Sequence, residues 1–170
     1  KIAGITPGRV FVVDLETRTV SATSNQGWET GPARAWDMAI SPDGRHLAAT
    51  GLGRRVRLYD PADLTKPAPP LGEFRTYDTA LVFHPDGSRL YITNESLHTV
   101  DIVDAVTLRV IGRVPLSGRP NNLMVTPDGK KVYAGIAQDL FPDAKVTSIA
   151  DGSGAFPGTE GITLAVAAFW

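Results

Sequence analysis

The side chains best placed to bind a ligand lie just before three copies of one tetrapeptide. The copies occupy residues 41–44, 84–87 and 126–129, and each ends in Pro-Asp-Gly. If each copy follows the innermost strand of a repeated unit, the residues before the copies surround one end of the fold, which we call the mouth. Positions there that differ from copy to copy are not needed to build the unit, so they are free to bind a ligand. Counting back seven, five and four residues from the start of each copy gives nine such positions: Arg34, Trp36, Asp37, Tyr77, Thr79, Ala80, Arg119, Asn121 and Asn122.

The chemistry of this set suits a small polar or anionic ligand. Arginine offers forked donors to a carboxylate or phosphate, and Trp or Tyr offers a flat apolar face. The sequence therefore predicts ligand binding at every position except Ala80: Arg34, Trp36, Asp37, Tyr77, Thr79, Arg119, Asn121 and Asn122. A structural interpretation competes with this one. In it, Trp36 packs between units, the two arginines form surface ion pairs and the two asparagines cap turns.

The histidines and the recurring aspartates are predicted to be structural. His84 occupies the position held by Ser41 and Thr126 in the other copies, which predicts a turn residue. His46 and His98 have no acidic residue or second histidine at ligand spacing, so no metal site is predicted. Six aspartates recur at matched places and are expected to form turns: Asp14, Asp43, Asp60, Asp86, Asp104 and Asp128.

No catalytic residue can be assigned from the sequence. The chain has no cysteine, no Gly-x-Ser-x-Gly motif, no His-Glu-x-x-His motif and no phosphate-binding glycine loop. We therefore expect no cofactor, and we favour a protein that is not an enzyme.

The elements that position these residues are short strands in a repeat of about 42 residues. The tetrapeptides are spaced 43 and 42 residues apart, a period typical of propeller blades. Pro-Asp-Gly favours a tight turn, and apolar residues alternate on both sides of it, so each copy should link two strands. A second recurring element ends a strand with Asp at positions 14, 60 and 104, and it predicts another turn in each unit. We expect no long helix.

At this point the sequence resembles the YVTN-type β-propeller repeat. The resemblance is carried by residues 89–94 (Arg-Leu-Tyr-Ile-Thr-Asn), 99–104 (Thr-Val-Asp-Ile-Val-Asp), 110–116 and 127–129, and it covers residues 9–137. It implies an all-β fold of four-stranded antiparallel blades around a central channel. That family includes bacterial surface and periplasmic proteins, and related propellers carry haem, quinone-dependent and lactonase chemistry.

The length and the C-terminal region predict an incomplete or small ring. About four units fill the 170 residues, whereas propellers of this repeat type usually need about seven. We assign residues 1–138 to propeller repeats and 139–170 to an irregular last blade or C-terminal segment of the same domain, in which 145–151 reads as a third strand. A fragment, or half of an oligomeric ring, is favoured over a closed disc of four blades, because open blade walls expose apolar surface.

Composition narrows the function classes. The net charge of −1 provides no field that would gather nucleic acid, and the longest apolar run, 162–170, is about half of a membrane span. The chain begins with Lys1, which predicts a processed or trimmed product. The leading hypothesis is a non-enzymatic binding or interaction scaffold, periplasmic or extracellular, with self-association and a small ligand or protein partner. The alternative is a piece of a propeller enzyme (a lactonase, a lyase, or a haem- or quinone-dependent oxidoreductase) whose catalytic residues lie on missing blades.

Overall fold

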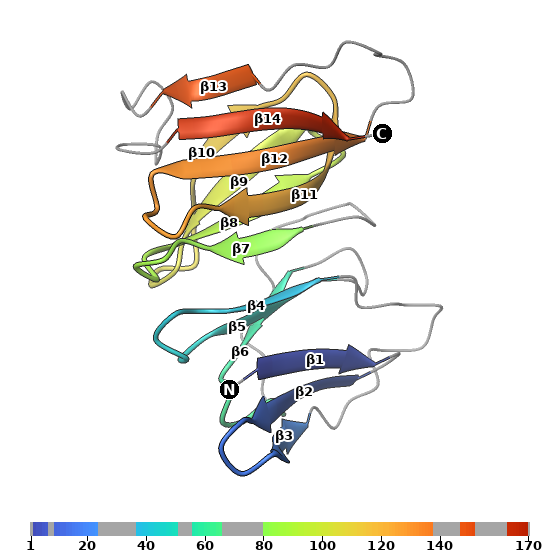
Figure 1. Ribbon diagram of the computed structural model, residues 1–170, viewed down its shortest axis with the longest axis vertical. Helices are drawn as coiled ribbons and strands as arrows, with labels where there is room; N and C mark the ends of the chain where they lie inside the picture. Colours follow the sequence, from blue (N-terminus) through green and yellow to red (C-terminus); the bar gives the residue numbers. More distant parts are fainter. Residues whose placement is uncertain are drawn as a thin grey trace.

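The computed structural model describes residues 2–6, 9–23, 37–50, 56–65, 80–137, 147–151 and 163–169, which form four β-sheets (Figure 1). The first sheet holds β1 (Ile2–Thr6), β2 (Arg9–Asp14) and β3 (Thr19–Thr23), and the second holds β4 (Met38–Ile40), β5 (Leu47–Ala49) and β6 (Arg57–Tyr59). The third holds β7 (Leu81–Phe83), β8 (Arg89–Asn94), β9 (Thr99–Asp104) and β10 (Val110–Pro115). The fourth holds β11 (Arg119–Val125), β12 (Lys131–Ala137), β13 (Thr147–Asp151) and β14 (Thr163–Phe169). The described part of the chain contains no helix, which confirms the predicted all-β class.

The three Pro-Asp-Gly turns form hairpins, as predicted. They join β4 to β5, β7 to β8 and β11 to β12, and each pair of strands is antiparallel. Each turn closes with a hydrogen bond from the glycine N–H to the carbonyl oxygen three residues earlier. Gly44, Gly87 and Gly129 have φ of 70°, 77° and 72°, the left-handed region that glycine adopts without strain. In Figure 1 these hairpin turns all lie on the left-hand side.

The second recurring aspartate also forms a turn, as the repeat predicted. Asp104 Oδ1 accepts hydrogen bonds from the N–H groups of Val106 (3.0 Å) and Thr107 (2.6 Å) and from the Thr107 hydroxyl. Asp14 does the same for the N–H groups two and three residues further on. The bonds from Thr107 outweigh the small effect of burial and lower the pKa of Asp104. Both carboxylates therefore stabilise the backbone of the turn in which they lie.

Apolar residues alternate along the strands, so the second and third sheets each pack on a neighbouring sheet at both faces. In β8, Leu90 and Ile92 face the second sheet, and Tyr91 faces the fourth. In β5, Ala48 faces the third sheet, and its neighbours in the strand face the first. Three apolar cores therefore fill the three gaps between successive sheets, which explains why the central strands are buried on both sides.

The four sheets follow one another as an open row. The first strand of each sheet contacts the first strand of the next, in the order β1, β4, β7 and β11. Figure 1 places the first and fourth sheets at opposite ends of the molecule, so the described strands form an arc of blades and not a closed disc. The third sheet is a complete four-stranded antiparallel blade with the order β10-β9-β8-β7.

The fourth sheet departs from the sequence-based expectation. The strand predicted to be third, within 145–151, is β13, and it lies at the outer edge, because the order is β11-β12-β14-β13. The third place is taken by β14, which pairs with β12 in parallel from Lys131↔Thr163 to Ala137↔Phe169. A nearly continuous apolar strand is typical of interior parallel positions, and the sequence of β14, Thr-Leu-Ala-Val-Ala-Ala-Phe, has this character.

Candidate functional site

The predicted mouth is the end of the sheets at which β4, β7 and β11 begin, opposite the hairpin turns. Of the predicted binding residues, Asp37, Arg119, Asn121 and Asn122 belong to the described part of the chain. The other four, Arg34, Trp36, Tyr77 and Thr79, lie outside the described residues. Asp37 precedes β4, and the other three described residues belong to the first half of β11.

Asp37 joins the second sheet to the third. Its Oδ1 accepts a hydrogen bond from the Met38 N–H (2.8 Å), and its Oδ2 accepts one from the Leu81 N–H (2.9 Å), which begins β7. Burial raises the pKa of the Asp37 carboxyl, although the bonds from Leu81 and Met38 oppose the rise. Both carboxylate oxygens therefore hold backbone in place at the mouth.

In the second and third sheets, a threonine hydroxyl accepts a backbone hydrogen bond where the first strand begins, at the mouth. The Ala80 N–H donates to Thr93 Oγ1 (2.7 Å), and the Asp37 N–H donates to Thr50 Oγ1 (3.2 Å). The fourth sheet has Gly135 at the matching place, opposite Asn122. In the fourth sheet, the first strand, β11, begins three residues before Asn122, at Arg119, and a bulge lies between Pro120 and Asn122.

Exposed polar side chains flank the bulge of the fourth sheet at the mouth. Arg119, Asn121 and Asn122 are all exposed, and Pro120 between them is buried. Bulges redirect side chains and occur often beside binding sites. The Nη1 atom of Arg119 lies 3.3 Å from Glu95 Oε1 in the β8–β9 turn, and the arginine side chain is 70% exposed. The first half of β11 thus exposes a guanidinium and two amides, and the partly buried Glu95 carboxylate lies beside the guanidinium.

A buried polar network lies at the same end of the third sheet. Asp101 in β9 is fully buried, and its carboxylate accepts hydrogen bonds from Thr99 Oγ1 (2.6 Å), Asn94 Nδ2 (3.3 Å) and Arg113 Nε (3.4 Å). Asn94 Oδ1 in turn accepts a hydrogen bond from the Leu97 N–H in the β8–β9 turn. A buried charge is tolerated when it is paired and hydrogen-bonded in this way. The network fixes the turn that presents Glu95 to Arg119.

Glu95, Asp101 and Arg113 lie outside the matched positions before the Pro-Asp-Gly turns, so the repeat did not predict them. Asp101 is a charged residue inside an otherwise apolar strand, and such a residue signals a buried polar contact. Its partner Arg113 lies on the next strand, directly opposite in the register. Glu95 left no comparable signal, because its contact with Arg119 depends on how two sheets meet.

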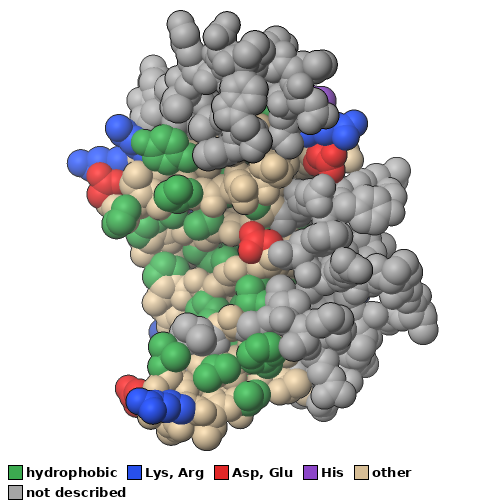
Figure 2. Space-filling view, turned by 45° about the vertical axis from the view of Figure 1, so that its right-hand side comes forward, with side chains coloured by type: hydrophobic (Ala, Val, Ile, Leu, Met, Phe, Trp, Pro, Cys, Tyr) green, Lys and Arg blue, Asp and Glu red, His purple; other side chains and the backbone are tan. Residues whose placement is uncertain are grey.

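The described residues show no other site of recognisable chemistry. They contain no group of three or more His, Asp or Glu side chains placed to hold a metal ion, and no helix that is long and apolar enough to cross a membrane. On the face shown in Figure 2, most acidic side chains lie beside basic ones in small groups, one acidic side chain lies apart from them, and hydrophobic side chains lie between the groups.

Comparisons with known proteins support the fold. No family model matches the chain. A 68-residue stretch is 28% identical to a Salmonella typhimurium protein with the description "Uncharacterized protein YncE", and it covers 40% of this chain and 19% of that protein. Among solved structures, the β-propeller-containing hydrazine synthase of Kuenenia stuttgartiensis matches with a TM-score of 0.63 and 17% identity, over 92% of this chain and 42% of that one. The chain thus spans less than half the length of the proteins it matches, and it is an all-β chain of the propeller type.

Proposed function

We propose that this chain is a binding scaffold that holds a small polar or anionic ligand, or an acidic group of a protein partner, at the mouth. The observation that carries the proposal is the exposed cluster at the start of β11, where a bulge presents Asn121 and Asn122 beside Arg119. The periplasm or the cell exterior is the proposed location, in keeping with the repeat family that the sequence resembles.

The Arg119–Glu95 pair makes a carboxylate ligand chemically reasonable. Exposed ion pairs contribute about 0–1 kcal/mol, so a ligand carboxylate can replace Glu95 at little cost. The guanidinium would then form a forked pair with the ligand, and the two asparagine amides would supply further donors and acceptors. The sequence-based prediction adds four residues to the proposed site: Arg34, Trp36, Tyr77 and Thr79.

Binding should respond in opposite directions to substitutions of the two partners. Dicarboxylates, sugar acids and sugar phosphates would be tested by calorimetry and by thermal shift. Arg119→Ala should weaken binding of an acidic ligand about tenfold, because the forked contact is lost, and Glu95→Gln should strengthen it, because a competing carboxylate is removed.

Arg45 provides a matched control. It is an exposed arginine at the opposite end of the sheets, where its Nε lies 3.8 Å from Asp43 Oδ2. Arg45→Ala should therefore leave binding unchanged. If every ligand leaves the melting temperature of the wild type unaltered, or if all three variants bind equally, the mouth does not bind anions. Hydrolytic turnover or a cofactor absorbance in a longer chain would instead favour the enzyme hypothesis.

A further inference from the structure

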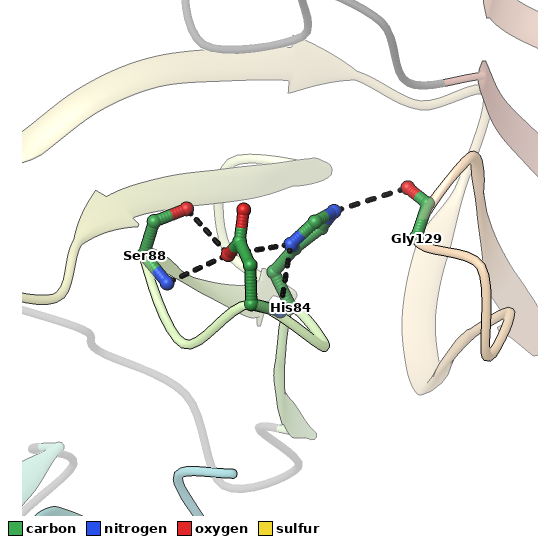
Figure 3. A network of polar contacts seen from close by, with 4 residues as sticks. His84, Ser88 and Gly129 are labelled. Atoms are coloured by element: carbon green, nitrogen blue, oxygen red, sulfur yellow. Dashed lines mark hydrogen bonds and ion pairs between the residues drawn. The ribbon is translucent and has the colours of Figure 1, made fainter. Parts of the chain in front are cut away.

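The hairpin turns of the third and fourth sheets are joined by a histidine, as Figure 3 shows. His84 Nδ1 lies 2.7 Å from Asp86 Oδ1 within its own turn. His84 Nε2 lies 3.1 Å from the carbonyl oxygen of Gly129, in the turn between β11 and β12. The histidine side chain is only 13% exposed, so the imidazole is held in the junction between two sheets.

Both ring nitrogens face an oxygen that can only accept a hydrogen bond. A neutral imidazole carries one N–H, so either neutral tautomer turns a lone pair toward the Asp86 carboxylate or toward the Gly129 carbonyl. The Asp86 N–H, 3.3 Å from Nδ1, offers the neutral ring a longer alternative donor, but the carboxylate oxygen remains 2.7 Å away. The imidazolium ion donates to both oxygens at once. This arrangement therefore fits the charged form of the ring.

The groups around the ring are compatible with a positive charge. The ring meets Tyr91 of β8 edge-on, with centroids 6.3 Å apart, and burial raises the pKa of Tyr91 to about 12, so the phenol stays neutral. Arg89 of β8 interacts with Tyr91 and is the cation on the same strand. From the fourth sheet, the Gly129 carbonyl is the group in contact with His84 among the described residues, and its neighbours in that turn, Asp128 and Lys130, are exposed. Asp86 is the counter-charge.

We propose that His84 is an acid-strengthened latch between the third and fourth sheets. When the ring is protonated, two charge-assisted hydrogen bonds join Asp86, His84 and Gly129 into one continuous chain across the junction. When the ring is neutral, one of the two bonds is lost. Lowering the pH favours the protonated ring, so acid tightens the latch.

The pKa of Asp86 sets the lowest pH at which the latch can form. Partial burial acts to raise the pKa of Asp86, but the bonds from the Ser88 hydroxyl and N–H and from His84 outweigh it and lower this pKa to about 2. A depressed carboxyl pKa contributes stability above the unfolded value of 3.8 and loses it as the pH falls toward 2. Asp86 therefore remains ionised at both pH 5 and pH 8.

The latch is tested by thermal unfolding at pH 5 and pH 8. His84→Ser introduces the residue that the second sheet carries at the same place, Ser41, and His84→Gln keeps an N–H donor that does not titrate. The melting temperature of the wild type should exceed that of His84→Ser by about 3–6 °C more at pH 5 than at pH 8. His84→Gln should lose this pH-dependent gain. A matched control, His46→Ser, should retain the pH dependence of the wild type.

Equal pH dependence in the wild type and in His84→Ser would overturn the proposal. A second measurement needs no substitution: nitrogen-15 NMR of the wild-type imidazole at pH 5 should show both ring nitrogens of His84 protonated and the Nε2 proton hydrogen-bonded to Gly129. A singly protonated His84 ring at pH 5 would also overturn it, even if the variants fail to fold.

Discussion

The glycine at position 129 meets two structural demands. Its φ of +72° favours glycine, as in the other two hairpin turns. A methyl group added at this position would in addition lie 2.5 Å from His84 Nε2 and 2.7 Å from its Cε1 atom. At Gly44, which has the same turn geometry, nothing lies within 4 Å of the added methyl. The two positions differ in their neighbour and not in their backbone.

Alanine at the two glycines should therefore separate backbone strain from the contact with His84. Gly44→Ala should cost about 1 kcal/mol of the free energy of unfolding, the cost of a left-handed alanine. Gly129→Ala should cost about 1–2 kcal/mol more, because the imidazole must leave its place against the Gly129 carbonyl. Urea denaturation of both variants measures the difference. Equal losses would show that the ring moves aside without penalty.

At the scale of the element, a threonine binds the first strand to the second in the second and third sheets. Thr93 is fully buried, and it accepts the hydrogen bond of the Ala80 N–H at the point where β7 is about to begin. A buried N–H without an acceptor is costly, so the threonine hydroxyl is needed even though the site is otherwise suited to an apolar residue.

Replacing the hydroxyl by a methyl group of similar size tests this role. Thr93→Val should cost about 1–3 kcal/mol of the free energy of unfolding, since the Ala80 N–H loses its acceptor. The control is Thr19→Val in β3, an exposed threonine on a strand, which should change stability by less than about 0.5 kcal/mol. Chemical denaturation provides both values. A loss at Thr93 no greater than at Thr19 would contradict the argument.

The hairpins at the three Pro-Asp-Gly turns, and the strands that end at or just before Asp14, Asp60 and Asp104, could be predicted because local signals agree there. Pro-Asp-Gly specifies a turn wherever it occurs, and alternating apolar residues specify a strand with two buried faces. The order of strands in the fourth sheet could not be predicted, since 145–151 carries the pattern of a third strand whereas pairing with β12 is decided by competition with β14. Likewise, the repeat placed Arg119 at the mouth, but nothing local indicated that Glu95 faces it.

At the scale of the whole molecule, the open row leaves the outer face of the first sheet without a neighbouring sheet among the described residues. Val10 and Val12 of β2 are fully buried against the second sheet. Phe11 and Val13 alternate with them, point to the other face and are only half-buried. Leu15 and Val20 nearby are 55% and 59% exposed. Such apolar side chains favour contact with a further sheet.

Self-association is the expected result. Light scattering after size exclusion should give a mass of at least twice the 18.1 kDa of one chain, because apolar sheet faces at the ends of the row pack against those of another copy. A chain truncated after Gln138 lacks β13 and β14 and should change its oligomeric state. A monomer at all concentrations, with or without the truncation, would contradict this expectation.

The parallel pairing of β12 with β14 has a consequence for the order of folding. Each strand of the third sheet pairs with the next strand along the chain, so this sheet forms through contacts between residues close in sequence. The β12–β14 ladder joins residues 32 positions apart, from Lys131↔Thr163 to Ala137↔Phe169. Closing a long stretch of chain costs entropy before any pairing can compensate for it, and such non-local contacts form slowly. We therefore expect the third sheet to form before the pairing of β12 with β14 completes the fourth.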